Sequence, residues 1–366
     1  DYTRIAKFVT PAGYVGGKMV GLKGEEAFMD YTFLHFSGFS DAQNRCWSDE
    51  LCNVMGLDKE KLPRIVDPWH VIGEVTDKAA KEFGLAPGTI VAAGCGDTAA
   101  NAFGGGVVKA GMLFDVAGTA SVFAGCADTF VADVKNRALM TMRSVIPGLW
   151  NPLAYIAGGG IAVRWYRDQF FNNCRGEPQN SPDDLYSVMI SQMEEIPPGS
   201  EGLFFSPHLG GRICPATPEM RGSWIGFSWG HTQAHFGRAV LESVAYEYAY
   251  YLSVMKELIP DLNMYEARVV GGGARSPVWN QIKADVLGVP YQPLMGNEFG
   301  SWGSAMIAGK AAGVYDDLAS VAEAHAILSG SPLRPDQETY VAYKKIVEQQ
   351  IKWQAILSQS YVEFDK

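Results

Sequence analysis

Asp97 is the residue whose type and position most clearly suggest chemistry. It follows an apolar stretch over 89–93 and a Gly-Cys-Gly turn, and residues from Thr98 onward have the pattern of a helix start. In open α/β sheets, ligands gather at the carboxyl ends of strands. A carboxylate there can accept a proton or hold a metal ion. Aspartate is also a favoured helix N-cap, so its position leaves the catalytic and capping interpretations equally open.

Glycine-rich turns stand next to expected strands at residues 117–121 and 271–274, and a further glycine cluster stands at 157–160. Bare backbone N–H groups in such turns can cradle phosphate oxygens, and small residues let an adenine approach the backbone. Each turn alone is also compatible with ordinary hairpin or helix-start geometry. Their recurrence favours a nucleotide site, and because the sequence contains no GxxxxGK[ST] motif, that site is not a P-loop.

Three other patterns are weaker. Residues 94–99 fit the loose dinucleotide fingerprint GxGxxA, for which Asp115 would be the ribose-binding acid, but a glycine-rich break intervenes. His231 and His235 have helical metal-ligand spacing without an evident third ligand, which favours a structural role. Cys95 has no nearby histidine partner in the sequence and is interpreted as a small buried thiol.

The elements that must position these residues alternate between strands and helices. Short apolar runs bounded by glycine are typical of buried strands, and longer periodic segments are typical of helices. This alternation predicts an α/β protein whose sheets are covered by helices. The expected helices are 75–84, 232–258, 278–287, 302–312 and 338–359, and the expected strands are 89–93, 111–116, 122–124, 267–270 and 289–291.

Composition excludes several classes of protein. The chain has 366 residues, of which 47% are hydrophobic, so it can bury large cores. Its net charge is −10 and no Lys/Arg run interrupts the acidic balance, which argues against nucleic-acid or anionic-membrane partners. The apolar runs are too short to span a bilayer. Six scattered cysteines predict reduced thiols and a cytoplasmic protein.

Several segments together resemble the FGGY family of carbohydrate kinases. The run 222–226, followed by His235-Phe236 and 239–242, resembles the family's C-terminal signature, with Phe227 standing where the family usually has an aliphatic residue. The segment 94–100 resembles the one that carries the family's catalytic aspartate. The segment 118–121 resembles its second phosphate turn.

Two further matches extend the resemblance. Residues 160–168 resemble the loop and helix beside the nucleotide, and 272–285 resemble the family's adenosine turn. The matches run from about residue 10 to about residue 330 and are closest to the xylulokinase-like branch. The set is specific, although its single pieces are not.

The resemblance implies an actin/hexokinase-like (ribonuclease H-like) ATPase fold with two domains around a cleft. Residues 1–107 would form the later part of the sugar-side domain, and 108–366 the nucleotide-side domain. It implies ATP-dependent phosphorylation of a sugar hydroxyl, with a ketopentose such as xylulose as the expected substrate. Asp97 would be the general base, would contact the sugar and would help hold Mg²⁺. A homodimer is compatible with the family.

The resemblance also assigns a set of nucleotide contacts. Two residues of the first turn would bind the β- and γ-phosphates of ATP, two would border the nucleotide, and the last turn would line the adenosine. In that order the expected residues are Gly118 and Thr119, then Gly160 and Arg164, then Gly272, Gly273, Ala274 and Ser276.

The sequence departs from the family in one large respect. The superfamily's opening hairpin with a DxGTxxxK/R-like phosphate loop is not found in these residues, so the first domain is expected to be incomplete. We therefore expect this chain alone to bind nucleotide weakly and not to turn over sugar. Two alternatives stay open: a catalytically inert nucleotide- or sugar-binding relative, and an NAD-dependent oxidoreductase.

Overall fold

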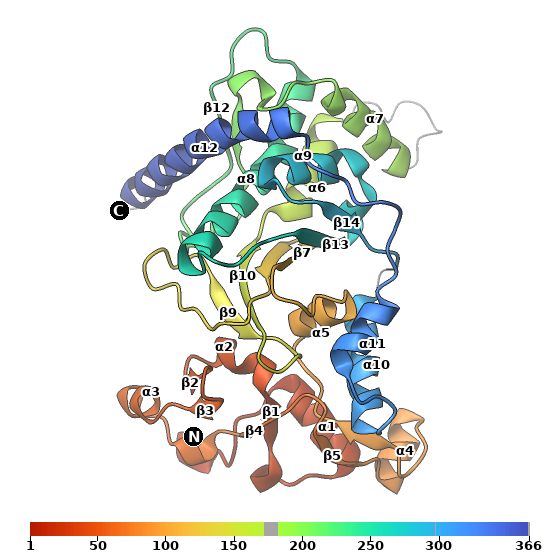
Figure 1. Cartoon of the computed structure of the whole chain (residues 1–366). Coiled ribbons are helices and arrows are strands. Elements are labelled where there is room, and N and C mark those ends of the chain that lie inside the picture. Colours follow the sequence, from red (N-terminus) through yellow and green to blue (C-terminus); the bar gives the residue numbers. More distant parts are fainter. Residues whose placement is uncertain (172–181, 297, 365–366) are drawn as a thin grey trace.

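The computed structural model describes residues 1–171, 182–296 and 298–364, and a six-stranded mixed sheet lies at its centre (Figure 1). The strand order is β14-β13-β7-β8-β10-β9. β13 runs parallel to β7 and β14, whereas β8, β10 and β9 continue from β7 in antiparallel pairs. The strands are β7 (Met112–Ala117), β8 (Ser121–Gly125), β9 (Met140–Arg143), β10 (Trp150–Ile156), β13 (Glu266–Val270) and β14 (Tyr291–Pro293).

Helices cover both faces of this sheet, because alternate strand residues are apolar on both sides. In β7, Leu113 belongs to one buried core and Phe114 to the other. One face packs against α6 (Gly159–Phe170), α7 (Pro182–Glu194), α8 (Gln233–Leu258), α9 (Pro277–Leu287) and α12 (Gln337–Phe364). The opposite face packs against α5 (Asp97–Gly104), α10 (Phe299–Ala311) and α11 (Leu318–His325) (Figure 1).

The region before α5 is built from small elements around three separate apolar clusters. It occupies the lower part of Figure 1. Its strands pair two by two: β1 (Phe28–Asp30) with β4 (Arg64–Val66), β2 (Ser40–Asp41) with β3 (Cys46–Trp47), and β5 (Val71–Glu74) with β6 (Ile90–Ala92). Its helices are α1 (Pro11–Val20), α2 (Leu34–Ser37), α3 (Asp49–Val54) and α4 (Asp77–Phe83).

Short elements complete the described chain. β11 (Phe204–Ser206) pairs with β12 (Ser223–Ile225) in a two-stranded sheet. The 3₁₀ helices are Tyr2–Arg4, Gly24–Glu26, Tyr31–Phe33, Lys59–Lys61, Ser200–Gly202 and Gly272–Arg275. In the described residues, no helix combines the length and hydropathy that a membrane crossing requires.

Helix α5 is held in place by an unusually close approach to α10. A Cβ atom added at Gly104 would lie 2.9 Å from the carbonyl carbon of Phe299, and one at Gly303 would lie 3.0 Å from that of Ala100. Such distances exclude any side chain at the two glycines without a backbone shift. The small residues of both helices therefore fix the position of α5, and with it the position of Asp97.

The dinucleotide interpretation of residues 94–99 is wrong in its structural context. The fingerprint requires a strand of a parallel βαβ unit before the glycine turn. The strand that precedes this turn, β6, pairs with β5 in an antiparallel two-stranded sheet. Asp115, the expected ribose-binding acid, lies fully buried in the middle of β7.

Candidate functional site

The turn at 118–120 and the start of α6 form one backbone unit at the carboxyl end of β7. The Gly160 N–H donates to the Gly118 carbonyl at 2.9 Å, and the Ile161 N–H donates to the Thr119 carbonyl at 2.9 Å. A side chain at Gly160 would collide with the Gly118 carbonyl. Thr119 and the adjoining Ala120 are exposed. Glycine is thus required at 160 by contact with the turn, whatever the site binds.

The turn at 271–275 packs against the same unit from the end of β13. Gly271 has a φ of +90°, and a Cβ there would lie 2.9 Å from the Ala117 carbonyl oxygen. At Gly273 a Cβ would lie 2.7 Å from both the Ala117 Cβ and the Trp279 ring. Gly272, by contrast, is exposed with open space around it. The two turns therefore touch through their backbones at Gly271, and Gly272 of the second turn stays exposed.

Residues at the start of helix α9 hold the second glycine turn in place through hydrogen bonds. Ser276 is the N-cap of α9 and accepts from the Trp279 N–H at 3.3 Å. The Asn280 side chain donates to the Ala274 carbonyl at 2.8 Å. The Trp279 indole donates to the Leu241 carbonyl of α8 at 3.0 Å. Ser276 is thus a helix cap in this structure, and its hydroxyl oxygen is engaged with the backbone.

Asp97 lies at the same edge of the sheet as these turns. It is the exposed first residue of α5, and Gly96 occupies the N-cap position. Thr98 and Asp97 lie near the Tyr155 side chain; burial raises the pKa of Tyr155, and the negative charge of Asp97 adds to the shift. Tyr155, the penultimate residue of β10, pairs with Val122 of β8. Val122 lies two residues after Ala120, the last residue of the first glycine turn. The structure therefore brings Asp97 and the glycine turns together.

The carboxylate of Asp97 is only partly engaged. Its Oδ1 accepts from the Thr98 N–H at 2.7 Å and from the Thr98 hydroxyl at 3.4 Å. The capping interpretation is wrong, because Gly96 is the N-cap of α5 and Asp97 is its first helical residue, although the Asp97 side chain accepts the Thr98 N–H. The other oxygen, Oδ2, has no hydrogen bond to a described residue and stays available to a ligand.

Sequence reasoning missed Thr32 and Asp30, which hold the turn before Asp97, and Tyr155, which lies near Asp97. The Gly96 N–H donates to the Thr32 hydroxyl oxygen at 2.9 Å, and that hydroxyl donates in turn to Asp30. Asp30 is buried, and this burial raises its pKa to about 6. Tyr155 completes the surroundings on the sheet side. No spacing rule joins Gly96 to a threonine 64 residues earlier, so only the folded chain reveals this support.

Arg164 occupies the second turn of α6, beyond the Gly118–Gly160 contact. Its side chain is exposed, and it makes no hydrogen bond or ion pair with the described residues. A guanidinium in this state can turn toward a phosphate oxygen without breaking an existing contact. The structure fixes its place on α6 but gives it no partner in the described chain.

The weaker chemical candidates have structural roles. The Nδ1 atoms of His231 and His235 accept backbone N–H groups from Ser228 and Thr232, which agrees with the structural interpretation. Burial raises the pKa of the Cys95 thiol, so it is a poor nucleophile. Among residues 1–171, 182–296 and 298–364, no group of three or more His, Cys, Asp or Glu side chains is arranged to hold a metal ion.

Comparison with protein-family models gives two matches. Residues 115–312 match the C-terminal domain of the FGGY family of carbohydrate kinases, and residues 1–104 match its N-terminal domain. The xylulose kinase of Lactococcus lactis is 26% identical over 368 residues, covering 100% of this chain and 70% of the relative. The gluconokinase of Bacillus subtilis is 26% identical over 346 residues, covering 92% of this chain and 65% of the relative.

Solved structures show the same architecture. A ligand-bound xylulose kinase from Lactobacillus acidophilus superposes with a TM-score of 0.87 at 21% identity, covering 98% of this chain and 69% of that one. A xylulose kinase from Rhodospirillum rubrum gives a TM-score of 0.83 at 25% identity, with coverages of 97% and 69%. The fold is therefore actin/hexokinase-like, and the chain spans roughly two thirds of the length of these relatives.

Proposed function

The chain belongs to the FGGY family of carbohydrate kinases, and from this premise we propose that it serves the ATP-dependent phosphorylation of a sugar hydroxyl. The observation that carries the proposal is the exposed Asp97 carboxylate at the sheet edge where the glycine turns meet. In this proposal residues 1–107 contribute to the sugar side of the site and residues 108–366 to the nucleotide side.

Asp97 would take the proton from the attacking sugar hydroxyl. Phosphoryl transfer passes through a loose transition state, so most of the catalysis is positioning and charge neutralisation, and a weak base suffices. The Thr98 N–H already orients Oδ1 at 2.7 Å, and the Thr32 contact at Gly96 fixes the backbone just before it. These contacts leave Oδ2 to face the sugar.

The glycine turns would hold ATP through their main chain. Gly118 and Thr119 would receive the β- and γ-phosphates, and Gly160 and Arg164 would border them. The exposed Gly272, with Gly273 and Ala274, would line the adenosine. Ser276 supports that turn as the cap of α9. Asp97 is the residue that would help hold Mg²⁺, whose preference for carboxylate oxygen and water suits an exposed aspartate; the bound ion would neutralise phosphate charge.

A ketopentose such as xylulose is the proposed substrate. The support is the naming of similar proteins, several of which are xylulose kinases. Gluconokinases match at comparable identity. A substrate panel therefore has to include D-xylulose and D-gluconate side by side.

The decisive experiment measures ADP release by the protein as its gene encodes it, with each sugar of the panel. We expect turnover with a ketopentose and a loss of about 10²- to 10⁴-fold in kcat for Asp97→Asn, the usual range for a general base, with ATP affinity unchanged. Asp77→Asn is the matched control, because Asp77 is likewise the exposed first residue of a short helix, α4.

Other outcomes separate the alternatives. Full activity in Asp97→Asn would reduce this aspartate to a structural residue and overturn the proposed mechanism. Saturable ATP binding without sugar-dependent ADP release would support an inert nucleotide-binding relative. A thermal shift with NAD that exceeds the shift with ATP would support the oxidoreductase alternative.

A further inference from the structure

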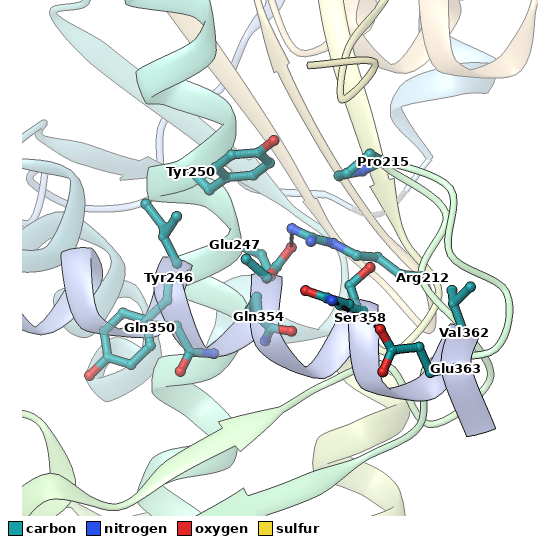
Figure 2. A pocket seen from close by; sticks show the side chains of 13 residues that line it. Arg212, Pro215, Tyr246, Glu247, Tyr250, Gln350, Gln354, Ser358, Val362 and Glu363 are labelled. Atoms are coloured by element: carbon teal, nitrogen blue, oxygen red, sulfur yellow. Dashed lines mark hydrogen bonds and ion pairs between the residues drawn. The ribbon is translucent and has the colours of Figure 1, made fainter. Parts of the chain in front are cut away.

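A cavity of about 570 Å³ lies between α8, α12 and the loop over 212–215 (Figure 2). It opens on the sheet face that carries α8 and α12, whereas α5 with Asp97 packs on the opposite face. The cavity is therefore separate from the proposed kinase site. Its volume falls within the range of about 300–1,000 Å³ that is typical of small-molecule sites.

Buried amide groups of α12 face this cavity without partners. Gln354 is 3% exposed, and neither its Nε2 nor its Oε1 has a hydrogen-bond partner in the described chain. Gln350 is 2% exposed; its Nε2 donates to the Phe205 carbonyl at 3.1 Å, but its Oε1 has no such partner. Figure 2 shows both amides among the lining side chains. Each unpaired buried polar group costs about 1–3 kcal/mol, so these atoms are suited to a polar ligand.

The charges on the inner wall neutralise each other. Arg212 donates to Glu247 at 2.9 Å. Burial alone would raise the pKa of Glu247, but the charge of Arg212 and the nearby His208 outweigh it and hold that pKa at about 2. Glu247 is thus ionised and paired with Nη2 of Arg212, and the buried Nε of Arg212 has no hydrogen-bond partner among the described residues. Exposed Glu363 is the remaining charged lining residue and disfavours an anion, whereas a neutral ligand meets donors and acceptors on the inner wall.

The remaining wall offers aromatic and aliphatic surface. The rings of Tyr246 and Tyr250 line one side from α8, and Ile351 and Val362 line the other from α12. Aromatic rings with nearby hydrogen-bonding groups suit a molecule that alternates C–H surface with hydroxyl groups. A vicinal pair of hydroxyls can accept from the Nε2 and donate to the Oε1 of one glutamine amide.

We infer that this cavity binds a neutral polyhydroxylated molecule of monosaccharide or polyol size, with the Gln354 amide as its central hydrogen-bonding group. The Oε1 of Gln350 accepts a further hydroxyl, and the Nε of Arg212 donates to another. This site does not depend on the proposed kinase chemistry, because its lining residues include neither Asp97 nor any residue of the glycine turns.

Calorimetric titration of the full chain with xylitol tests the inference, with adenine as the comparison probe. We expect saturable xylitol binding that weakens at least tenfold in Gln354→Leu. Gln349→Leu is the matched control, because Gln349 is the exposed glutamine one position before Gln350 on the same helix. Binding must persist in Asp97→Asn, which separates this cavity from the kinase site.

A second variant guards against a folding artefact. Ala355→Phe fills the cavity from its rim and leaves the amide of Gln354 in place, so it must also abolish binding. Removal of the unpaired amide in Gln354→Leu is expected to leave the melting temperature unchanged or higher. Absence of xylitol binding, equal affinity in Gln354→Leu and the unmutated chain, or adenine binding that Ala355→Phe abolishes would each overturn the inference.

Discussion

Two aspartates beside the same sheet have opposite environments. Asp97 begins α5, is exposed, and keeps one carboxylate oxygen without a partner in the described residues. Asp115 lies in the middle of β7, is fully buried, and accepts from Lys283 Nζ at 2.6 Å and from the Tyr248 hydroxyl at 2.7 Å. Sequence patterns offered both as ligand-binding acids. Burial and partners separate them: Asp97 stays accessible to a ligand, whereas Asp115 is engaged in buried contacts of the fold.

The buried ion pair of Asp115 and Lys283 also supports the second glycine turn indirectly. Burial lowers the pKa of Lys283, and Asp115 opposes that shift. The Lys283 ammonium lies 4.1 Å from the centre of the Trp279 ring, and that ring packs against Gly273 in the second turn. The buried Lys283 therefore packs against Trp279, and Trp279 in turn packs against the exposed second glycine turn.

The sharpest test of this contrast is Lys283→Met, for which we expect the largest loss of stability, about 3–5 kcal/mol. The substitution leaves a carboxylate buried without its cation. Denaturant unfolding measures the loss, and Lys345→Met, at an exposed position of α12, is the control. The double variant Asp115→Leu/Lys283→Met should regain most of the stability. A single variant as stable as the unmutated chain would contradict the view that Asp115 is a committed structural acid.

A smaller effect is expected for Gly271→Ala at the turn edge. An alanine would be strained at a φ of +90° and would press on the Ala117 carbonyl, which together cost about 1–3 kcal/mol. We expect lower stability and weaker ATP binding, measured by thermal unfolding and by titration. Gly313→Ala shares the positive φ but has open space around it, so it should lose some stability without affecting ATP. Equal ATP affinity in both variants would dissociate this turn from nucleotide binding.

A third expected effect appears only over a limited pH interval. Because the folded-state pKa of Asp30 is raised to about 6 from 3.8, the protonated form favours the fold. That contribution is fully present below pH 3.8 and is lost as the pH rises through about 6. Asp30→Asn should remove this dependence, so its stability relative to the unmutated chain should improve between pH 4 and 7. Unfolding curves across this range measure it, with exposed Asp261→Asn as the control; parallel profiles for Asp30→Asn and the unmutated chain would refute it.

The elements with strong local signals were predictable from the sequence. The helix expected over 232–258 is α8 with Thr232 as its N-cap, and the one expected over 278–287 is α9, capped by Ser276. Their apolar periodicity and caps are local features. The strand expected at 289–291 is found at Tyr291–Pro293, because its end is set by pairing with β13 and the sequence alone does not determine that register.

The site was predictable only in part. Glycine turns and an aspartate after a strand are visible in the sequence, and the structure gathers them at one edge. The Thr32 contact to Gly96 and the Tyr155 contact to Thr98 join residues far apart along the chain. The amide of Gln354 likewise looks like an ordinary polar helix residue until its burial is known. Such features depend on tertiary contacts, which no periodicity encodes.

The contact between Gly160 and the Gly118 carbonyl has a consequence for how this edge could change over generations. Neighbouring positions 158 and 159 are equally closed to a Cβ, by Pro207 and Ser121. These three glycine positions cannot be varied by exchanging one side chain for another. Variation at this edge therefore has to come from moving the strands that present it, or from its exposed side chains, Thr119, Ala120 and Arg164.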